Sequence, residues 1–204
     1  MANDQGARYG AFPVYNPQSP PVLLYYKVET SATLDMFRGQ FVQINSRGNA
    51  QVYSQAGSGG ILGVAWDFLD SNLAGLPSGM TKLDQGAYLP KATDGYVGVT
   101  IDPNQLYLME ESTGGTALSA NSIGCFIDFT YLATSGNTNT GWANTVLKQA
   151  SLITSGTTAP LQLLNVYNII NQDGSINTAG DSCKWVVRVT KPQLAPVALG
   201  IIQG

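Results

Sequence analysis

The chain has 204 residues, of which 44% are hydrophobic and only 11% charged, and its net charge is −3. An average soluble protein has roughly a quarter of its residues charged, so uncharged polar residues must supply much of this surface, and the small net charge gives no electrostatic footprint for nucleic acid or an anionic membrane. Histidine is absent, which excludes the Ser-His-Asp triad and most zinc sites.

Residues 1–28 are predicted to form an extended N-terminal arm. Four prolines lie between positions 13 and 21, and proline cannot donate to a strand ladder, so this stretch does not fit a central strand. The arm nevertheless carries Tyr9, Phe12, Val14 and Tyr15, whereas disordered tails are poor in aromatic residues. We therefore expect the arm to lie on its own body or on a neighbouring molecule.

A β-rich body is predicted over residues 29–191, with a division into two sub-domains near 111–120 as one option. The segment 41–45 alternates apolar and polar side chains, 46–49 is turn-like, and 51–53 would be the returning strand. The Gly-Ser-Gly-Gly segment at 57–60 could be a phosphate-binding loop or a turn. A β-branched run follows it instead of a helix with a lysine, which favours the turn.

Two similar phrases indicate strands in which a glycine marks a bulge or a close backbone approach. They are Ile61-Leu62-Gly63-Val64-Ala65 and Tyr96-Val97-Gly98-Val99-Thr100. Short helices are considered for 32–37 and 142–148, and the segment 161–170 fits either a helix or a strand. A strand is favoured there because the turn-like Asn-Gln-Asp-Gly at 171–174 follows, with 184–190 as its hairpin partner.

The cysteines Cys125 and Cys183 are 183 − 125 = 58 positions apart and form no C-x-x-C pair, so metal and redox motifs are not indicated. Buried free thiols are expected in preference to a disulfide. The N-terminus lacks the apolar core of a signal peptide, and no apolar run reaches the ~18 residues that a transmembrane helix needs. The protein is therefore expected to be made and kept in a reducing cytoplasm, or to leave it by lysis.

Candidate chemistry in the sequence is sparse. The carboxylate pairs Asp67 with Asp70 and Glu110 with Glu111 could serve a glycosidase only if the fold brought two carboxylates to face each other across a sugar. The oxygen-rich segment 171–177 departs from the calcium-loop pattern and lacks its closing Glu. No catalytic, metal or cofactor-binding residues are assigned, and the chain is not expected to be an enzyme.

Tyrosine is abundant, and the aromatic side chains fit a strand core, a protein interface or a sugar-binding platform. Besides Tyr9 and Tyr15, the tyrosines are Tyr25, Tyr26, Tyr53, Tyr88, Tyr96, Tyr107, Tyr131 and Tyr167. A sugar-binding platform would be reported by the fluorescence of Trp66, Trp142 or Trp185. The C-terminal tail, 192–204, mirrors the arm, because Pro192 and Pro196 interrupt an apolar segment.

The segments FVQINSRGNAQVYSQAGSGGILGVAWDF at 41–68, LQLLNVYNIINQDGS at 161–175 and CKWVVRVTKPQL at 183–194 resemble head proteins of tailed bacteriophages, in particular capsid decoration (cement) proteins. The resemblance implies an all-β fold of antiparallel sandwich or barrel-like units, with extended terminal arms and little helix. It also implies a homotrimer on the virion surface that binds the major capsid protein and bridges capsid subunits.

The residues expected to contact the partner lie in the two chain ends, because apolar side chains there would otherwise be left in water. They are Tyr9, Phe12, Val14, Tyr15, Leu194, Val197, Leu199 and Ile201. A glycan- or receptor-binding virion domain, such as a head fibre or tail fibre, is the alternative function. A hydrolase is the least favoured, and neither a nucleic acid nor a membrane is expected as a partner.

Overall fold

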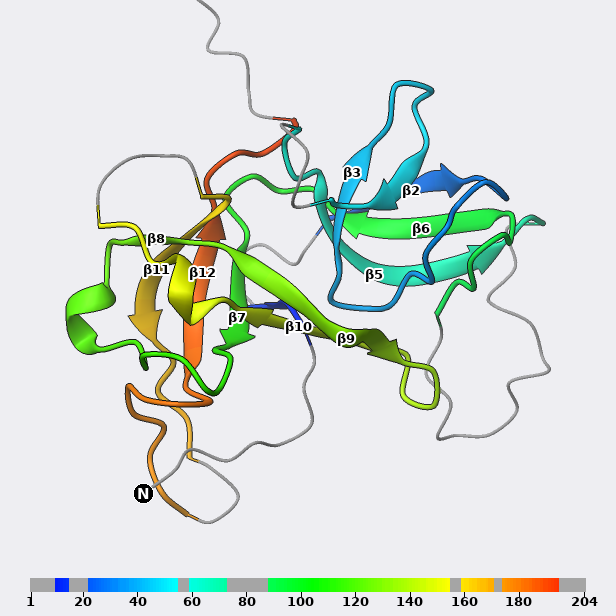
Figure 1. Ribbon diagram of the computed structural model, residues 1–204. Helices are drawn as coiled ribbons and strands as arrows, with labels where there is room; N and C mark the ends of the chain where they lie inside the picture. Colours follow the sequence, from blue (N-terminus) through cyan, green and yellow to red (C-terminus); the bar gives the residue numbers. More distant parts are fainter. Residues whose placement is uncertain are drawn as a thin grey trace, which may run out of the picture.

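The computed structural model describes residues 10–14, 22–54, 59–72, 88–154, 159–170 and 174–194, without the side chains of 133 and 134. Within these ranges the strands form three antiparallel sheets (Figure 1). The helical segments described are two short 3-10 turns, Ala120–Ser122 and Gln149–Ser151. The predicted all-β fold is therefore confirmed.

Sheet A lies on the left of Figure 1 and contains five strands in the order β1-β7-β12-β11-β8. Their bounds are Phe12–Pro13, Leu106–Glu110, Lys184–Val189, Leu161–Val166 and Phe126–Ile127. In β12, buried Trp185 and Val187 alternate with half-buried Lys184 and Val186, so one face of the sheet packs on a core. The predicted pairing of β11 with β12 is confirmed, although residues 167–183 connect the two strands where a tight hairpin was expected.

Sheet B lies on the right of Figure 1 and has the strand order β2-β6-β5-β3-β4. Its strands are Leu23–Val28, Gly95–Thr100, Gly63–Asp70, Phe41–Ile44 and Ala50–Val52. The predicted turn between β3 and β4 is present, with Gly48 at a φ of +83°, where a side chain would be strained. The element that follows Gly60 is the strand β5, and no helix begins there. This agrees with the turn predicted at 57–60, although Gly57 and Ser58 lie outside the described residues. Strand β2 falls within the range predicted for the arm.

A two-stranded ribbon, β9 (Phe129–Asn137) with β10 (Trp142–Leu147), runs from the side of sheet A towards sheet B (Figure 1). Near its tip the ribbon contacts the segment that precedes β3, where the Ala143 N–H donates to the Arg38 carbonyl at 2.7 Å. A Cβ atom at Gly136 would collide with the ring of Phe37. The ribbon therefore ties the two larger sheets together.

Both short helices considered from sequence are wrong. Residues 142–147 form β10, in which buried Ala143 and Thr145 alternate with half-buried Trp142 and Asn144, a period of two that a strand satisfies. Residues 32–37 form no helix, and Met36 instead makes an isolated bridge with Leu89. Tertiary pairing thus overrode the weak helical preference of both segments.

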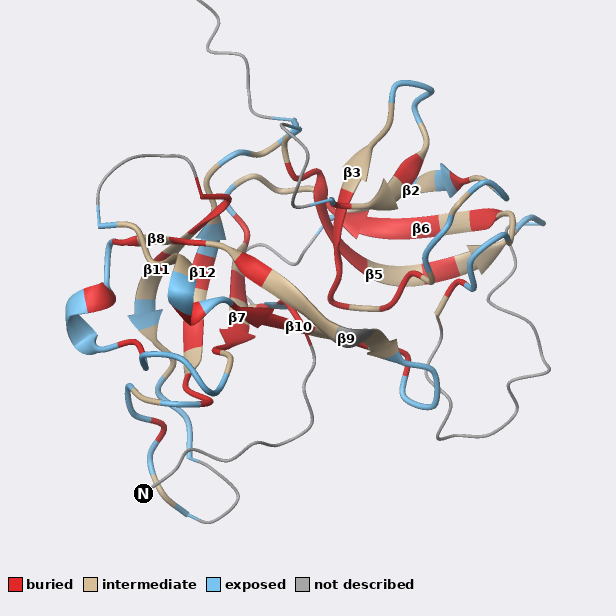
Figure 2. Ribbon diagram, viewed as in Figure 1, coloured by how far each residue is buried: buried red, intermediate tan, exposed pale blue. Residues whose placement is uncertain are grey.

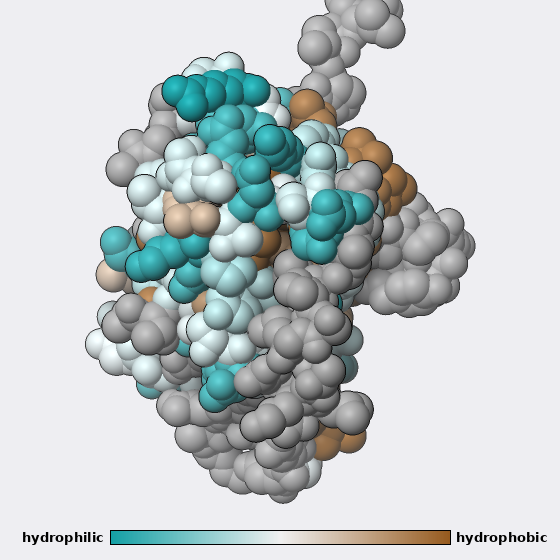
Figure 3. Space-filling view, turned by 90° about the vertical axis from the view of Figure 1, so that its right-hand side faces the viewer, coloured by the Kyte–Doolittle hydropathy of each residue, from teal (hydrophilic) through white to brown (hydrophobic). Residues whose placement is uncertain are grey.

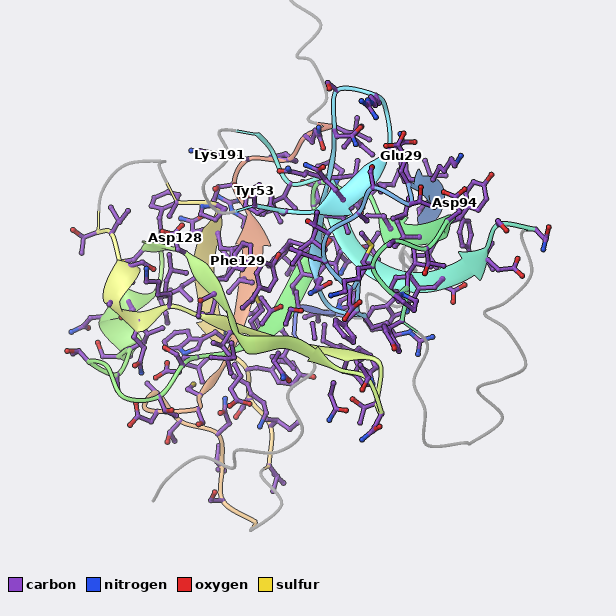
Figure 4. The ribbon with its side chains drawn as sticks, turned by 45° about the vertical axis from the view of Figure 1, so that its right-hand side comes forward. Glu29, Tyr53, Asp94, Asp128, Phe129 and Lys191 are labelled. Carbon is purple, nitrogen blue, oxygen red and sulfur yellow. The ribbon has the colours of Figure 1, made fainter. Side chains whose placement is uncertain are left out.

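The buried residues form two hydrophobic clusters, one centred on each large sheet, and Figure 2 shows buried segments on both sheets and on the ribbon. An aromatic seam links β3 and β9, because the ring centroids of Phe41 and Phe129 are 4.5 Å apart. Tyr53, which lies beside Phe129 in Figure 4, joins this seam at 5.9 Å, and the Tyr131 hydroxyl donates to the Tyr53 carbonyl. The two clusters interleave along the chain, because Phe41 and Val64 belong to the sheet A cluster whereas their neighbours Val42 and Ala65 belong to the sheet B cluster.

Candidate functional site at the junction of the sheets

The N-terminal segment 10–14 is bound to the body where the sheets meet. The Ala11 N–H donates to the Gly39 carbonyl at 2.9 Å, and the Val14 N–H donates to the Leu106 carbonyl at 2.8 Å. Between them, β1 pairs with β7 at the edge of sheet A. Phe12 and Val14, predicted to bind a partner, thus lie on this molecule's own body, and Tyr9 and Tyr15 lie outside the described residues.

The C-terminal segment also connects the two large sheets. After β12 in sheet A, the Gln193 N–H donates to the Ile61 carbonyl at 2.7 Å, and the Gln193 side chain bonds to both backbone groups of Ile44 in sheet B. Leu194, the next residue, is 49% exposed. Of the predicted contacts in the tail, Val197, Leu199 and Ile201 lie outside the described residues.

Three aromatic side chains from three different sheets meet at the N-terminal anchor. Phe12 and Trp66 form a T-shaped pair with ring centroids 5.1 Å apart, and Phe12 stacks on Trp142 at 6.0 Å. Trp66 and Trp142 are 5.5 Å apart. Phe12 is 37% exposed, so the group is a surface feature and not part of either core.

A β-bulge positions Trp66. In the pairing of β5 with β6, Ala65 opposes Val99 and Asp67 opposes Gly98, which leaves Trp66 without a partner residue. Bulges bend a strand locally and redirect a side chain. The bulge thus allows neighbouring Trp66 and Asp67 to contribute to one surface.

Arg38 connects these residues. Its Nε donates to the Trp66 carbonyl at 2.8 Å, its guanidinium lies 5.9 Å from the centre of the Trp142 ring, and its Nη2 is 3.9 Å from Asp67 Oδ1. An arginine over an indole face adds a cation–π contact of about 0.5–1 kcal/mol at an exposed site. The guanidinium is therefore held between an aromatic and a carboxylate.

Tyr25 completes the group from β2. Its hydroxyl donates to Asp67 Oδ2 at 2.7 Å, and its ring lies over Gly98, where an added Cβ would be 3.0 Å from the ring edge. The bond to Asp67, followed by partial burial and the Asp67 charge, raises the pKa of Tyr25 above 10.0. We refer to these residues as the outer cluster: Phe12, Tyr25, Arg38, Trp66, Asp67 and Trp142.

The sheet A core holds a second polar group, the buried cluster of Glu111, Gln149 and Trp185, and Gln149 also donates to the exposed carboxylate of Asp181 at 3.0 Å. Glu111 is fully buried; its Oε2 accepts from the Trp185 indole at 2.6 Å and its Oε1 accepts from Gln149 at 3.0 Å. Burial raises the pKa of Glu111 to about 7, despite these donors and the Leu118 backbone N–H, which favour the charged form. This carboxyl is enclosed within the sheet A core and is not exposed at the surface.

The remaining candidates from sequence have structural roles. Asn177, in the oxygen-rich loop, donates to the Tyr167 and Lys184 carbonyls and accepts from the Lys184 N–H, so it fixes the base of that loop. The described residues include no group of His, Cys, Asp and Glu side chains that could hold a metal ion. Cys125 and Cys183 are buried free thiols, as predicted.

Two surface hollows lie away from the outer cluster. One of about 430 Å³ lies between residues 29–36 and the β3–β4 hairpin, and the other, of about 490 Å³, lies on sheet A beside Arg188 and Phe126. Figure 3, which views the molecule from the sheet B end, shows separate hydrophobic patches among hydrophilic side chains. The outer cluster is distinguished from these hollows by its joined aromatic and charged groups.

Comparison of the chain with protein-family models, curated proteins and solved structures finds no match. Among the residues that the structure describes, no helix is long and apolar enough to cross a membrane.

Sequence reasoning identified Tyr25, Trp66, Asp67 and Trp142 separately but did not bring them together, and it did not select Arg38. The bulge itself is visible only in the folded strand, where the buried residues of 64–68 are Val64, Ala65 and Phe68 and the alternation of a regular strand is broken. The position of Arg38 opposite this bulge depends on long-range pairing.

Proposed function

We propose that this protein is a structural virion protein that binds the outside of a phage capsid and stabilises it by bridging capsid subunits. The observation that carries the proposal is that both chain ends are anchored where the two large sheets meet. The N-terminal anchor joins Ala11 to Gly39, and the C-terminal anchor joins Gln193 to Ile44 and Ile61. Residues 1–9 precede the first of these anchored segments in the chain, and residues 195–204 follow the second.

Anchored extensions suit a clamp. A segment that is fixed at its base loses less conformational freedom when its end binds a neighbour, so more of the contact energy appears as affinity. In a symmetric homotrimer, three such bodies would present their extensions together, and effective concentration would multiply weak contacts. The low charge of the chain also suits close packing against a shell.

The test uses heads of the encoding phage that were assembled without this protein. Purified protein is added, the heads are sedimented, and bound copies per head are counted alongside the temperature at which the heads open. We expect saturable binding at a symmetric copy number and a higher opening temperature. Removing residues 1–9 or 195–204, which leaves both anchors in place, is expected to weaken retention by ~10-fold or more.

Two results would contradict the proposal. One is that the intact protein does not bind the heads; the other is that it is found on the tail of the complete virion. Light scattering of the free protein tests the trimer separately. A stable trimer is expected, and a protein that stays monomeric both in solution and on heads would exclude the trimeric clamp.

A further inference from the structure

We infer that the outer cluster is a carbohydrate-binding site that takes a short, neutral oligosaccharide. The inference does not depend on capsid binding. It follows from the order of groups across the surface. The polar groups of Arg38 and Asp67 lie in the middle, with the ring of Tyr25 on one side and the stacked rings of Phe12 and Trp142 on the other.

Tyr25 offers an aromatic face. Its ring passes close to Gly98, because the position of an added Cβ there would lie 3.0 Å from Cε1 and 3.3 Å from Cζ. The residue is still 44% exposed, so much of the phenol is open to solvent. The negative face of an aromatic ring attracts the slightly positive C–H groups of a sugar ring, and glycine leaves room for the phenol to lie close to the sheet.

The groups between the aromatic rings keep hydrogen-bonding capacity. The contact of Arg38 Nη2 with Asp67 is 3.9 Å, too long for a hydrogen bond, so guanidinium N–H groups remain to bind hydroxyls. Among the described residues the indole N–H of Trp66 has no acceptor. A carboxylate has about four lone-pair positions, and Tyr25 occupies one of those of Asp67.

This arrangement fits a sugar better than a protein contact. Protein hot spots enter pockets and exclude water, whereas the side chains of Arg38 and Asp67 are 30% and 38% exposed and lie between rings. A sugar presents C–H faces to aromatic rings and hydroxyls at its edge to donors and acceptors. The arginine and the carboxylate compensate each other, which favours a neutral sugar over an anionic one.

The groups are also held in place before a ligand arrives. Arg38 is fixed by a backbone acceptor, an aromatic face and a carboxylate, and the bulge in β5 fixes Trp66 beside Asp67. Sites that are preorganised lose less entropy on binding. An exposed site of this size is expected to bind weakly, with a Kd of about 0.1–1 mM.

The test titrates the purified full chain with hexasaccharides and follows tryptophan fluorescence and the heat of binding. The probes are maltohexaose, cellohexaose, laminarihexaose, mannohexaose, galactohexaose and the β-1,4 hexamer of N-acetylglucosamine. We expect at least one to bind, and Tyr25→Ala to weaken its binding about tenfold. Leu24→Ala is the matched control, because Leu24 is 45% exposed on the opposite face of the same strand, and it should leave the affinity unchanged.

The three tryptophans give a second control. Trp185 is fully buried, so a variant with both Trp66→Phe and Trp142→Phe should lose the fluorescence change on addition of sugar. A change that persists would place the sugar elsewhere and overturn the inference, as would equal losses in the Tyr25 and Leu24 variants or no binding of any probe. If no probe binds and Tyr25→Ala instead releases the protein from heads, the outer cluster is a capsid contact.

Discussion

The outer and buried clusters are built from similar groups in opposite surroundings. Each contains a carboxylate close to a tryptophan, Asp67 with Trp66 and Glu111 with Trp185. In the buried cluster the donors are used, since the Trp185 indole and the Gln149 amide both point at Glu111. In the outer cluster the Arg38 and Trp66 N–H groups have donor capacity left.

This difference separates a polar group that shapes a fold from one that can recognise a ligand. A buried polar group must be satisfied inside the protein, because an unmade hydrogen bond there costs about 1–3 kcal/mol. At the surface water fills the remaining positions, so unused donors cost little and a ligand can replace the water. Mutation of the buried cluster, whose hydrogen bonds are satisfied, is therefore expected to lower the stability of the fold. Mutation of the outer cluster, which has unused donors, is expected to affect ligand binding more than stability.

The largest expected effect is from removing one indole N–H in each cluster. Trp185→Phe leaves the buried Glu111 without its closest donor and should lower the free energy of unfolding by about 3 kcal/mol near pH 8. Trp66→Phe removes an N–H that no described residue accepts and should cost less than about 1 kcal/mol. Urea denaturation of both variants measures the difference, and equal losses would mean that the two clusters do not differ in this way.

The second effect is a pH dependence that only the buried cluster should show. Burial raises the pKa of Glu111 from 4.5 to about 7, so between these values the folded protein holds a proton that the unfolded chain has released. The stabilisation is complete below 4.5 and is lost as the pH rises through 7. From about pH 5 to about pH 8 the loss of stability should be about 2 kcal/mol larger in the wild type than in Glu111→Gln.

The slope of stability against pH is the quantity to compare in this test. In Glu111→Gln the new amide N–H would face the amide N–H of Gln149, and two donors cannot form a hydrogen bond. The variant is therefore also expected to have a lower free energy of unfolding by an amount that does not depend on pH. Two other titratable groups face Glu111, the carboxylate of Asp181 and the thiol of Cys183. Burial raises the pKa of Cys183 to about 12, above this pH window. Parallel curves for wild type and variant would show that Glu111 does not titrate there.

Several strands of the two large sheets were predictable from local patterns, whereas β7, the two strands of the ribbon and the outer cluster were not. Alternation predicted β3 and β12, and the apolar-apolar-Gly-Val phrases predicted close approach at Gly63 and Gly98. In the structure the two glycines have different surroundings. A Cβ at Gly63 would collide with the Thr100 carbonyl, whereas one at Gly98 would meet the Tyr25 ring. The sequence pattern contains no information about which strand lies opposite, and for that reason the meeting of Tyr25 with Asp67 was not foreseen.

A smaller effect is expected from Gly98→Ala, which changes the support of the Tyr25 ring. The new Cβ would lie 3.0 Å from the ring and 3.3 Å from the Asp67 Cβ, so the ring must lift away. Because the phenol is at the surface, unfolding free energy should change by less than about 1 kcal/mol. Sugar affinity should nevertheless fall in the titration. A large loss of stability would instead show that Gly98 is needed for the sheet itself.

The smallest expected effect, and the most local, is from Asp67→Asn. The Tyr25 hydroxyl donates to the Asp67 carboxylate at 2.7 Å, and removing its proton would place two negative charges side by side, so the pKa of Tyr25 is raised. Asparagine removes that charge, and the pKa should return towards 10.0, while stability changes by less than about 0.5 kcal/mol because exposed charge pairs contribute little. The measurement is an absorbance titration near 295 nm, with the Tyr25→Phe curve subtracted to isolate this phenol. If the pKa of Tyr25 does not move, the hydroxyl is not bound to Asp67 in solution, and the ring loses the contact that holds its edge beside Arg38.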